Sequence, residues 1–261
     1  MKLLKLEAKA AALDLSRELA YKANFFLKCT AFVFTDFIGP IITLLIYSST
    51  LGVPGWSFHE LLLFQGTLIM VFGLGHLFVI ALPYITIHAI DRGEFDKYLI
   101  KPYSPLLYLL TQSILVEGIV EVAAGVLISG FAIYNLGLPV LSVNFLAYLL
   151  LIFVGLLFQM TMMILISALA FLVVKSDALM ILFFKLTDFA RWPISIYSTL
   201  LKLFLIFLFP VAVSSFFPAE ILLRGISLKV MAQACIPVLV FLFIALAVWK
   251  LAMKKYASAG G

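Results

Sequence analysis

The sequence predicts an all-α polytopic membrane protein, because of its composition and the length of its apolar stretches. Of the 261 residues, 65% are hydrophobic and only 12% are charged, and the mean hydropathy is +1.20. Soluble domains are about half apolar and about a quarter charged. A helix needs about 20 apolar residues to cross a hydrocarbon core ~30 Å thick. Composition therefore excludes a soluble domain and predicts one transmembrane domain over residues 1–261.

Seven apolar stretches predict six crossings. They cover residues 30–51, 61–87, 106–134, 145–174, 178–197, 203–223 and 230–251. Lys and Arg gather before the first stretch, between the second and third, and after the last, whereas the loops at 52–60 and 135–144 contain none. Because cytoplasmic loops carry the excess of basic residues, both termini are expected in the cytoplasm. The number of crossings is then even, so one stretch does not cross.

Two stretches are candidates for the one that does not cross. The stretch at 203–223 is divided by Pro210, and proline removes a helical hydrogen bond and bends or ends a helix. Its halves are too short to span, which favours a re-entrant helical hairpin. The stretch at 178–197 contains three charged residues, which are also costly inside a membrane. The residues favour the first candidate only modestly.

The N-terminal residues 1–24 predict an amphipathic helix that lies on the cytoplasmic membrane surface. One face of this helix would carry Leu3, Leu6, Ala10 and Leu13. The lysines fall off that face, which suits contact with lipid head groups. A solvated helical leader is the alternative.

A charged loop, IDRGEFDKYLIKP at residues 90–102, separates the second and third stretches and holds six charges in thirteen residues. Aromatic residues commonly anchor protein interfaces, and charges around them select the partner. A partner-binding loop and an ordinary solvated loop both fit this composition. In the first case, the contact residues would be Ile90, Asp91, Arg92, Gly93, Glu94, Phe95, Asp96, Tyr98 and Leu99. The apolar anchor would be formed by Ile90, Phe95, Tyr98 and Leu99, and Gly93 would permit a sharp turn.

Two acidic residues, Glu117 and Glu121, lie four apart near the middle of the third stretch. Charges at this depth are costly and usually face the interior of the bundle. One interpretation is a site for a cationic substrate. The other is a structural role, either paired with Lys185 or Arg191 or protonated and packed in the bundle.

Other polar residues within the stretches predict helix packing. His76 and Gln159 are expected to form hydrogen bonds between helices, and Gly73 and Gly75 to permit a close approach of two helices. The three histidines lie at different expected depths, so no metal site is predicted. The chain has no G-x-x-x-x-G-K-[ST] segment for nucleotide phosphates.

Three segments together resemble the type-2 ABC exporter permeases. They are the charged loop, the segment 190–225 with its prolines, and the C-terminal segment 249–261 that ends in YASAGG. The resemblance implies six spans, a coupling helix within 88–104, and an outer re-entrant hairpin at 198–225 between the fifth and sixth spans. It thus selects 203–223 as the stretch that does not cross.

The resemblance also implies a non-catalytic permease subunit of an ATP-driven exporter in the bacterial cytoplasmic (inner) membrane. Such a subunit moves a small or lipophilic molecule, for which the acidic residues suggest a cationic compound, out of the cytoplasm or the inner leaflet. Its partners are membrane lipid, a second identical or paralogous permease, and cytoplasmic ABC ATPase subunits, which bind ATP and Mg²⁺. No cofactor is expected in this chain, and nucleic acid is not an expected partner.

A stand-alone secondary transporter is the competing function class. It would couple transport to an ion through intramembrane carboxylates, for which Glu117, Glu121 and Asp188 are the candidates. This alternative does not explain the charged loop.

Overall fold

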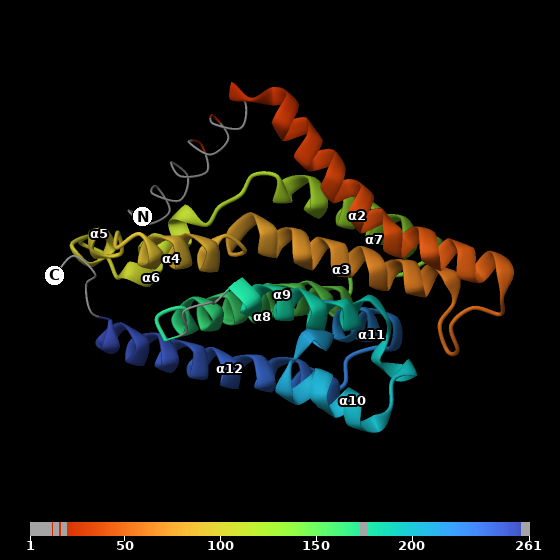
Figure 1. Cartoon of the computed structure of the whole chain (residues 1–261). Helices are drawn as coiled ribbons and strands as arrows, with labels where there is room; N and C mark the ends of the chain where they lie inside the picture. The colour runs from red at the N-terminus through yellow and green to blue at the C-terminus, as the bar shows by residue number, and fades with distance from the viewer. Residues whose placement is uncertain (1–11, 13–15, 17–19, 173–176, 257–261) are drawn as a thin grey trace.

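The computed structural model describes residues 12, 16, 20–172 and 177–256, which form helices joined by turns and loops and contain no strand (Figure 1). The expected surface helix at 1–24 lies outside this range apart from residues 12, 16 and 20–24. The last residues of the expected C-terminal signature, 257–261, also lie outside it.

Five helical segments in the described part of the chain are long and apolar enough to cross a membrane. They are α2 (Lys22–Ser49), α3 with α4 (Phe58–Phe78 and Leu82–Asp91), α7 (Gly118–Asn135), α8 (Val143–Leu169) and α12 (Leu228–Lys255). The protein is therefore a multi-pass membrane protein.

The expected crossing at 178–197 is not one long helix. It consists of α9 (Asp177–Thr187) and two short 3₁₀ turns, η1 (Asp188–Arg191) and η2 (Ile194–Ile196). At ~1.5 Å per residue, the eleven residues of α9 span roughly half of a hydrocarbon core. Pro193 accounts for the break after η1, because the residue before a proline favours extended backbone, and Trp192 is extended.

The expected third stretch is also divided, into α6 (Pro105–Gln112) and α7. Residues 113–117 interrupt the helix, and the Leu115 amide donates to the Leu77 carbonyl oxygen at 3.0 Å. This bond ties the interruption to the end of α3. The third stretch thus contains a helix long enough to cross, α7, but it is not one continuous helix.

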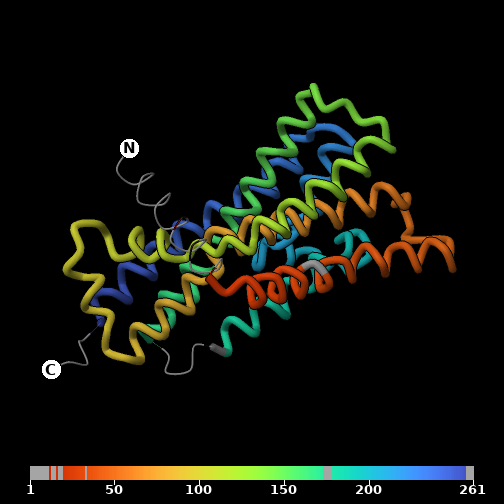
Figure 2. Tube along the Cα trace, turned by 90° about the horizontal axis from the view of Figure 1, so that it is seen from above, coloured from red at the N-terminus to blue at the C-terminus, as the bar shows by residue number. Residues whose placement is uncertain are grey.

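Helices α3 and α7 pack at very short range. A Cβ atom on Gly73 of α3 would lie 2.6 Å from the Val122 backbone nitrogen of α7, and one on Gly75 would overlap the Gln159 amide of α8. Backbone atoms leave no room for a side chain at Gly73, so the predicted close packing is confirmed there, whereas the neighbour at Gly75 is the end of a side chain. Figure 2 shows these helices running alongside one another.

The second half of the bundle is built on α8, which packs against α12 and against the segment that Pro210 divides. That segment comprises α10 (Thr199–Leu203), η3 (Phe204–Leu208, a π-helical turn), η4 (Val211–Ser214) and α11 (Phe216–Arg224). Its core side chains, such as Leu205 and Val213, are fully buried. The division at Pro210 agrees with the sequence-based expectation.

Helix α2 crosses the bundle at an angle, and the C-terminal end of α2 approaches α3 (Figure 1). Many of its large apolar side chains are exposed, among them Phe26, Phe34, Ile38 and Leu44. Lipid or a second subunit would cover such a surface in a membrane.

Candidate functional site

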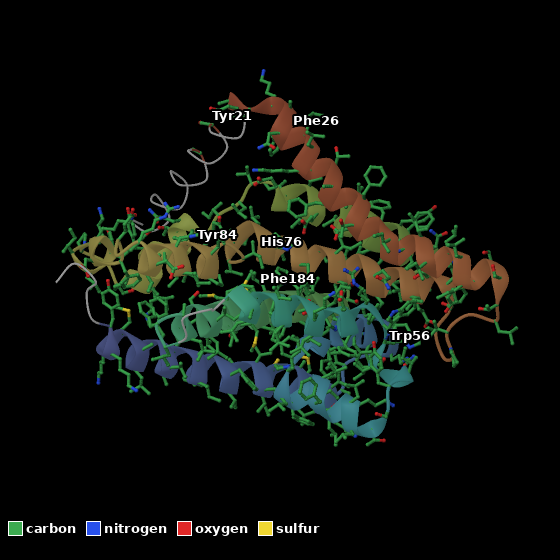
Figure 3. All side chains as sticks on the ribbon, viewed as in Figure 1. Tyr21, Phe26, Trp56, His76, Tyr84 and Phe184 are labelled. Carbon is green, nitrogen blue, oxygen red and sulfur yellow. The ribbon has the colours of Figure 1, made fainter. Side chains whose placement is uncertain are left out.

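Two adjoining cavities lie beneath α2. The first, about 340 Å³, is lined by α2, α3 and the α9–η1 segment and contains Asp36, Gln65, Lys185 and Arg191. The second, about 510 Å³, is lined by Lys28 of α2, Glu117 and apolar side chains; we call it the Glu117 cavity. Phe32, His76 and Phe184 line both. Figure 3 shows His76 on α3 and Phe184 on α9 near the middle of the bundle.

Glu117 and Glu121 both lie inside the bundle, where they are 5% and 1% exposed. Glu117 directly precedes α7 and Glu121 is in its first turn, so they lie at the start of a helix and not within a continuous span. Lys28 Nζ donates to Glu117 Oε1 at 2.9 Å, and His76 Nδ1 lies 2.5 Å from Glu121 Oε2. These two contacts tie α2 and α3 to α7.

One alternative for the two glutamates was a structural pairing with Lys185 or Arg191, and that alternative is wrong. Arg191 is paired instead with Asp188, whose Oδ1 lies 3.1 Å from Arg191 Nε. Lys185 lines the first cavity and forms no ion pair with either glutamate in the part of the chain that the structure describes. Lys28 and His76 contact the two glutamates instead.

The predicted hydrogen bonds between helices are confirmed for His76 and Gln159. His76 joins α3 to α7 through Glu121. The Gln159 Nε2 group of α8 donates to the Val71 carbonyl oxygen of α3 at 2.7 Å. The partner that sequence reasoning missed is Lys28, which was assigned to the charged flank of the first span. A lysine within an apolar helix was the available signal, because such a charge usually has a partner.

Some buried carboxylate oxygens have no hydrogen-bond partner. They include Glu117 Oε2 and Glu121 Oε1, and Asp36 Oδ2 in the first cavity. A buried anionic oxygen without a donor is unfavourable by about 1–3 kcal/mol or more. The polar lining beneath α2 is thus incompletely satisfied.

The charged loop is built on the C-terminal end of α4. Gly93 has φ of +66°, and the Glu94 amide donates to the Ala89 carbonyl oxygen at 2.8 Å. Left-handed backbone at this position favours glycine and ends the helix. The chain then turns into the short helix α5 (Asp96–Leu99). The sharp turn expected at Gly93 is therefore present.

The Phe95 side chain faces the interior of the bundle. It is fully buried, and its ring centroid lies 4.8 Å from that of Phe171 and 5.2 Å from that of Tyr256. Tyr98 is also buried and packs on Phe95 at 5.6 Å. Phe95 and Tyr98 therefore cannot be the exposed apolar anchor that the sequence suggested, because the ends of α8 and α12 cover them.

The outward edge of the charged loop is formed by other residues. Leu99 is 44% exposed and Ile100, which sequence reasoning did not include, is 82% exposed. Glu94 and Lys97 beside them are exposed and form an ion pair. This hydrogen bond lowers the pKa of Glu94 and raises that of Lys97. Both groups are therefore charged at neutral pH, next to two exposed apolar side chains.

The described residues contain no group of three or more His, Cys, Asp or Glu side chains that could hold a metal ion. The chain also lacks a phosphate-binding glycine-rich loop. The candidate site thus has two parts. One is the polar space inside the bundle, and the other is the exposed, charged edge of the loop at the end of the bundle.

A bundle of apolar helices with a polar internal space and a charged end loop is compatible with a membrane transport protein. Residues 31–260 match the family model described as ABC-2 family transporter protein. The chain belongs to this family and is an ABC transporter permease. No curated protein and no solved structure matched the chain.

Proposed function

We propose that this chain is the permease subunit of an ATP-driven exporter and moves a small or lipophilic molecule out of the cytoplasm or the inner leaflet. Separate ABC ATPase chains would bind ATP and Mg²⁺ and hydrolyse ATP. A second permease, identical or paralogous, would complete the assembly. The family match supports the transport role, and the polar space beneath α2 provides a path for a substrate.

The observation that carries the proposal is the exposed edge of the charged loop. Leu99 and Ile100 offer an apolar contact, and the Glu94–Lys97 pair beside them offers a fixed charge pattern. The loop backbone is held from behind by Phe95 and Tyr98, so the edge is presented on a rigid base. A rigid apolar contact with charges around it suits a protein partner, and we assign the ATPase to it.

The proposed topology has six spans, with both termini and the charged loop in the cytoplasm. The contact between Phe95 and Tyr256 supports this, because it puts the end of α12 beside the charged loop. The sixth crossing would be supplied by the interrupted segment from α9 to η2. The segment 198–225 would then be the re-entrant hairpin on the outer face. Its buried packing on α8 suits this role, since irregular backbone at membrane depth must be covered by protein.

The function is tested by replacing both apolar residues of the exposed edge. The Leu99→Asp, Ile100→Asp permease should reach normal abundance, because both side chains are exposed, but should no longer co-purify with its ATPase. We expect at least about a tenfold loss of association, since two carboxylates would face a dry apolar contact. Affinity purification of the co-expressed subunits measures this.

The matched control is the double variant Val140→Asp, Leu141→Asp in the loop between α7 and α8, where the two side chains are 54% and 100% exposed; it should co-purify as the wild type does. The proposal fails if the double variant retains both the ATPase and ATP-dependent transport. It also fails if the purified permease transports on an ion gradient without any ATPase.

The hairpin is tested with single cysteines at Leu200 and Ile226, which are 79% and 47% exposed. In a background with Cys29 and Cys235 replaced by alanine, both positions should react with a membrane-impermeant maleimide added to intact cells. Both ends of a re-entrant hairpin lie on one side of the membrane. Labelling of only one position from outside would mean that the segment crosses.

A further inference from the structure

The Glu117 cavity contains a buried acidic side chain with one oxygen atom that is available to a ligand. Glu117 is 5% exposed, lines the cavity, and uses only Oε1 in its contact with Lys28. Its Oε2 is buried without a hydrogen-bond partner. A carboxylate oxygen in this state is most stable when a cation or a donor approaches it. The open space of about 510 Å³ in front of it is large enough for an organic ligand.

The charge balance favours a cation. Two buried carboxylates lie at or beside this cavity, Glu117 and Glu121, and Lys28 is the ammonium group that contacts the first of them. Glu121 is in contact with His76. A cationic ligand is attracted by these carboxylates, whereas an anionic ligand is repelled by them.

The rest of the lining suits a lipophilic cation. Apart from Lys28, His76 and Glu117, the cavity is lined by apolar residues, including the rings of Phe32 and Phe184. Aromatic faces attract cations, by about 0.5–2 kcal/mol, more strongly where water is excluded. A small hydrated metal ion would gain nothing from these rings, and the described residues hold no cluster of metal ligands.

In the ion pair with Glu117, Lys28 is the partner that a ligand can displace. Its side chain is 39% exposed, whereas that of Glu117 is 6% exposed. It comes from α2, which crosses the bundle at an angle and exposes much of its apolar surface. The ammonium group can therefore reach polar surroundings through its flexible stem, while Glu117 stays fixed at the start of α7. The pair is asymmetric, because the Lys28 side chain is partly exposed and the Glu117 side chain is buried.

We propose that the Glu117 cavity binds a lipophilic organic cation, which takes the place of the Lys28 ammonium group at Glu117. This inference rests on the proposed transport function and names the substrate class of that permease. The cation lies between the rings of Phe32 and Phe184, and its charge faces Glu117. Release of Lys28 frees the inner part of α2 from α7, which links occupancy of the cavity to the position of α2.

The test is direct binding of radiolabelled tetraphenylphosphonium to the purified permease in lipid nanodiscs, without ATPase. The Glu117→Gln variant should bind about tenfold more weakly or worse, which corresponds to ~1.4 kcal/mol or more. The Lys28→Met variant should bind more tightly, by about threefold to tenfold, because the competing cation is gone. A purely structural ion pair would give no gain in affinity.

The control is Glu220→Gln, which removes another carboxylate of an ion pair, with Arg224 at 3.0 Å, elsewhere in the fold; its affinity should be unchanged. Should Glu117→Gln prove unstable, the Lys28→Met, Glu117→Gln double variant removes both charges together and should still lose binding. Equal binding by wild type and the Glu117 variants, weaker binding by Lys28→Met, or no binding by the wild type would each overturn the inference. None of these outcomes bears on ATPase association, so the proposed function fails or stands on its own test.

Discussion

Gly125→Leu is expected to abolish the folded permease. A Cβ atom at Gly125 of α7 would overlap the Met70 backbone nitrogen of α3, and neither helix backbone can move without opening the tightest contact in the bundle. Overpacking with a flexible neighbour costs about 1–3 kcal/mol, and a backbone neighbour makes the loss larger. Size-exclusion chromatography of the detergent-solubilised protein should show loss of the monodisperse peak.

The matched control lies on the same helix. Gly130→Leu adds the same side chain where no heavy atom lies within 4 Å of the new Cβ. It should be neutral or stabilise the helix by up to about 1 kcal/mol, since leucine is the better helix former. Equal behaviour of the two variants would mean that the close contact between α3 and α7 is absent.

Phe95→Ala is expected to have the largest effect of any truncation in the charged loop. The ring is fully buried among Phe171, Tyr98 and Tyr256, and removal of a buried phenylalanine costs about 3–5 kcal/mol. The midpoint of thermal unfolding, followed by loss of the folded chromatographic peak, should fall clearly. ATPase association should fall with it, because the edge at Leu99 loses its support.

Leu99→Ala is the comparison. This side chain is 44% exposed, and exposed substitutions usually change stability by less than about 0.5 kcal/mol. Its thermal midpoint should match the wild type. A stable Phe95→Ala variant and an unstable Leu99→Ala variant would contradict this structure. They would mean that Leu99 is buried and that Phe95 faces outward.

The difference between these two residues could not be predicted from the sequence. Phe95 and Leu99 are four apart, which predicts one shared face on a regular helix. The helix α5 begins only at Asp96 and has four residues, so the spacing does not apply. Phe95 is buried by Phe171 and Tyr256, which lie far away in the chain, and no local pattern indicates their proximity.

For Glu117 and Glu121, too, the sequence predicted one property and missed another. The sequence alone indicated that Glu117 and Glu121 face the interior, because charges in an apolar stretch must avoid lipid; both are buried. It could not identify Lys28 and His76 as their partners. That choice depends on where α2 and α3 pass α7 and on the interruption at 113–117, which a backbone bond to Leu77 stabilises.

The sequence by itself determined the class of protein, because hydropathy and helix length depend on composition over some twenty residues at a time. It also determined that Pro210 divides the stretch in which it lies, since proline acts on its own backbone and that of its neighbours. Only the tertiary structure decided which loop residues face outward, which charges meet, and that the segment at 178–197 forms one short helix and two turns. These features depend on contacts between segments far apart in the chain, and those contacts are set by packing of the whole bundle.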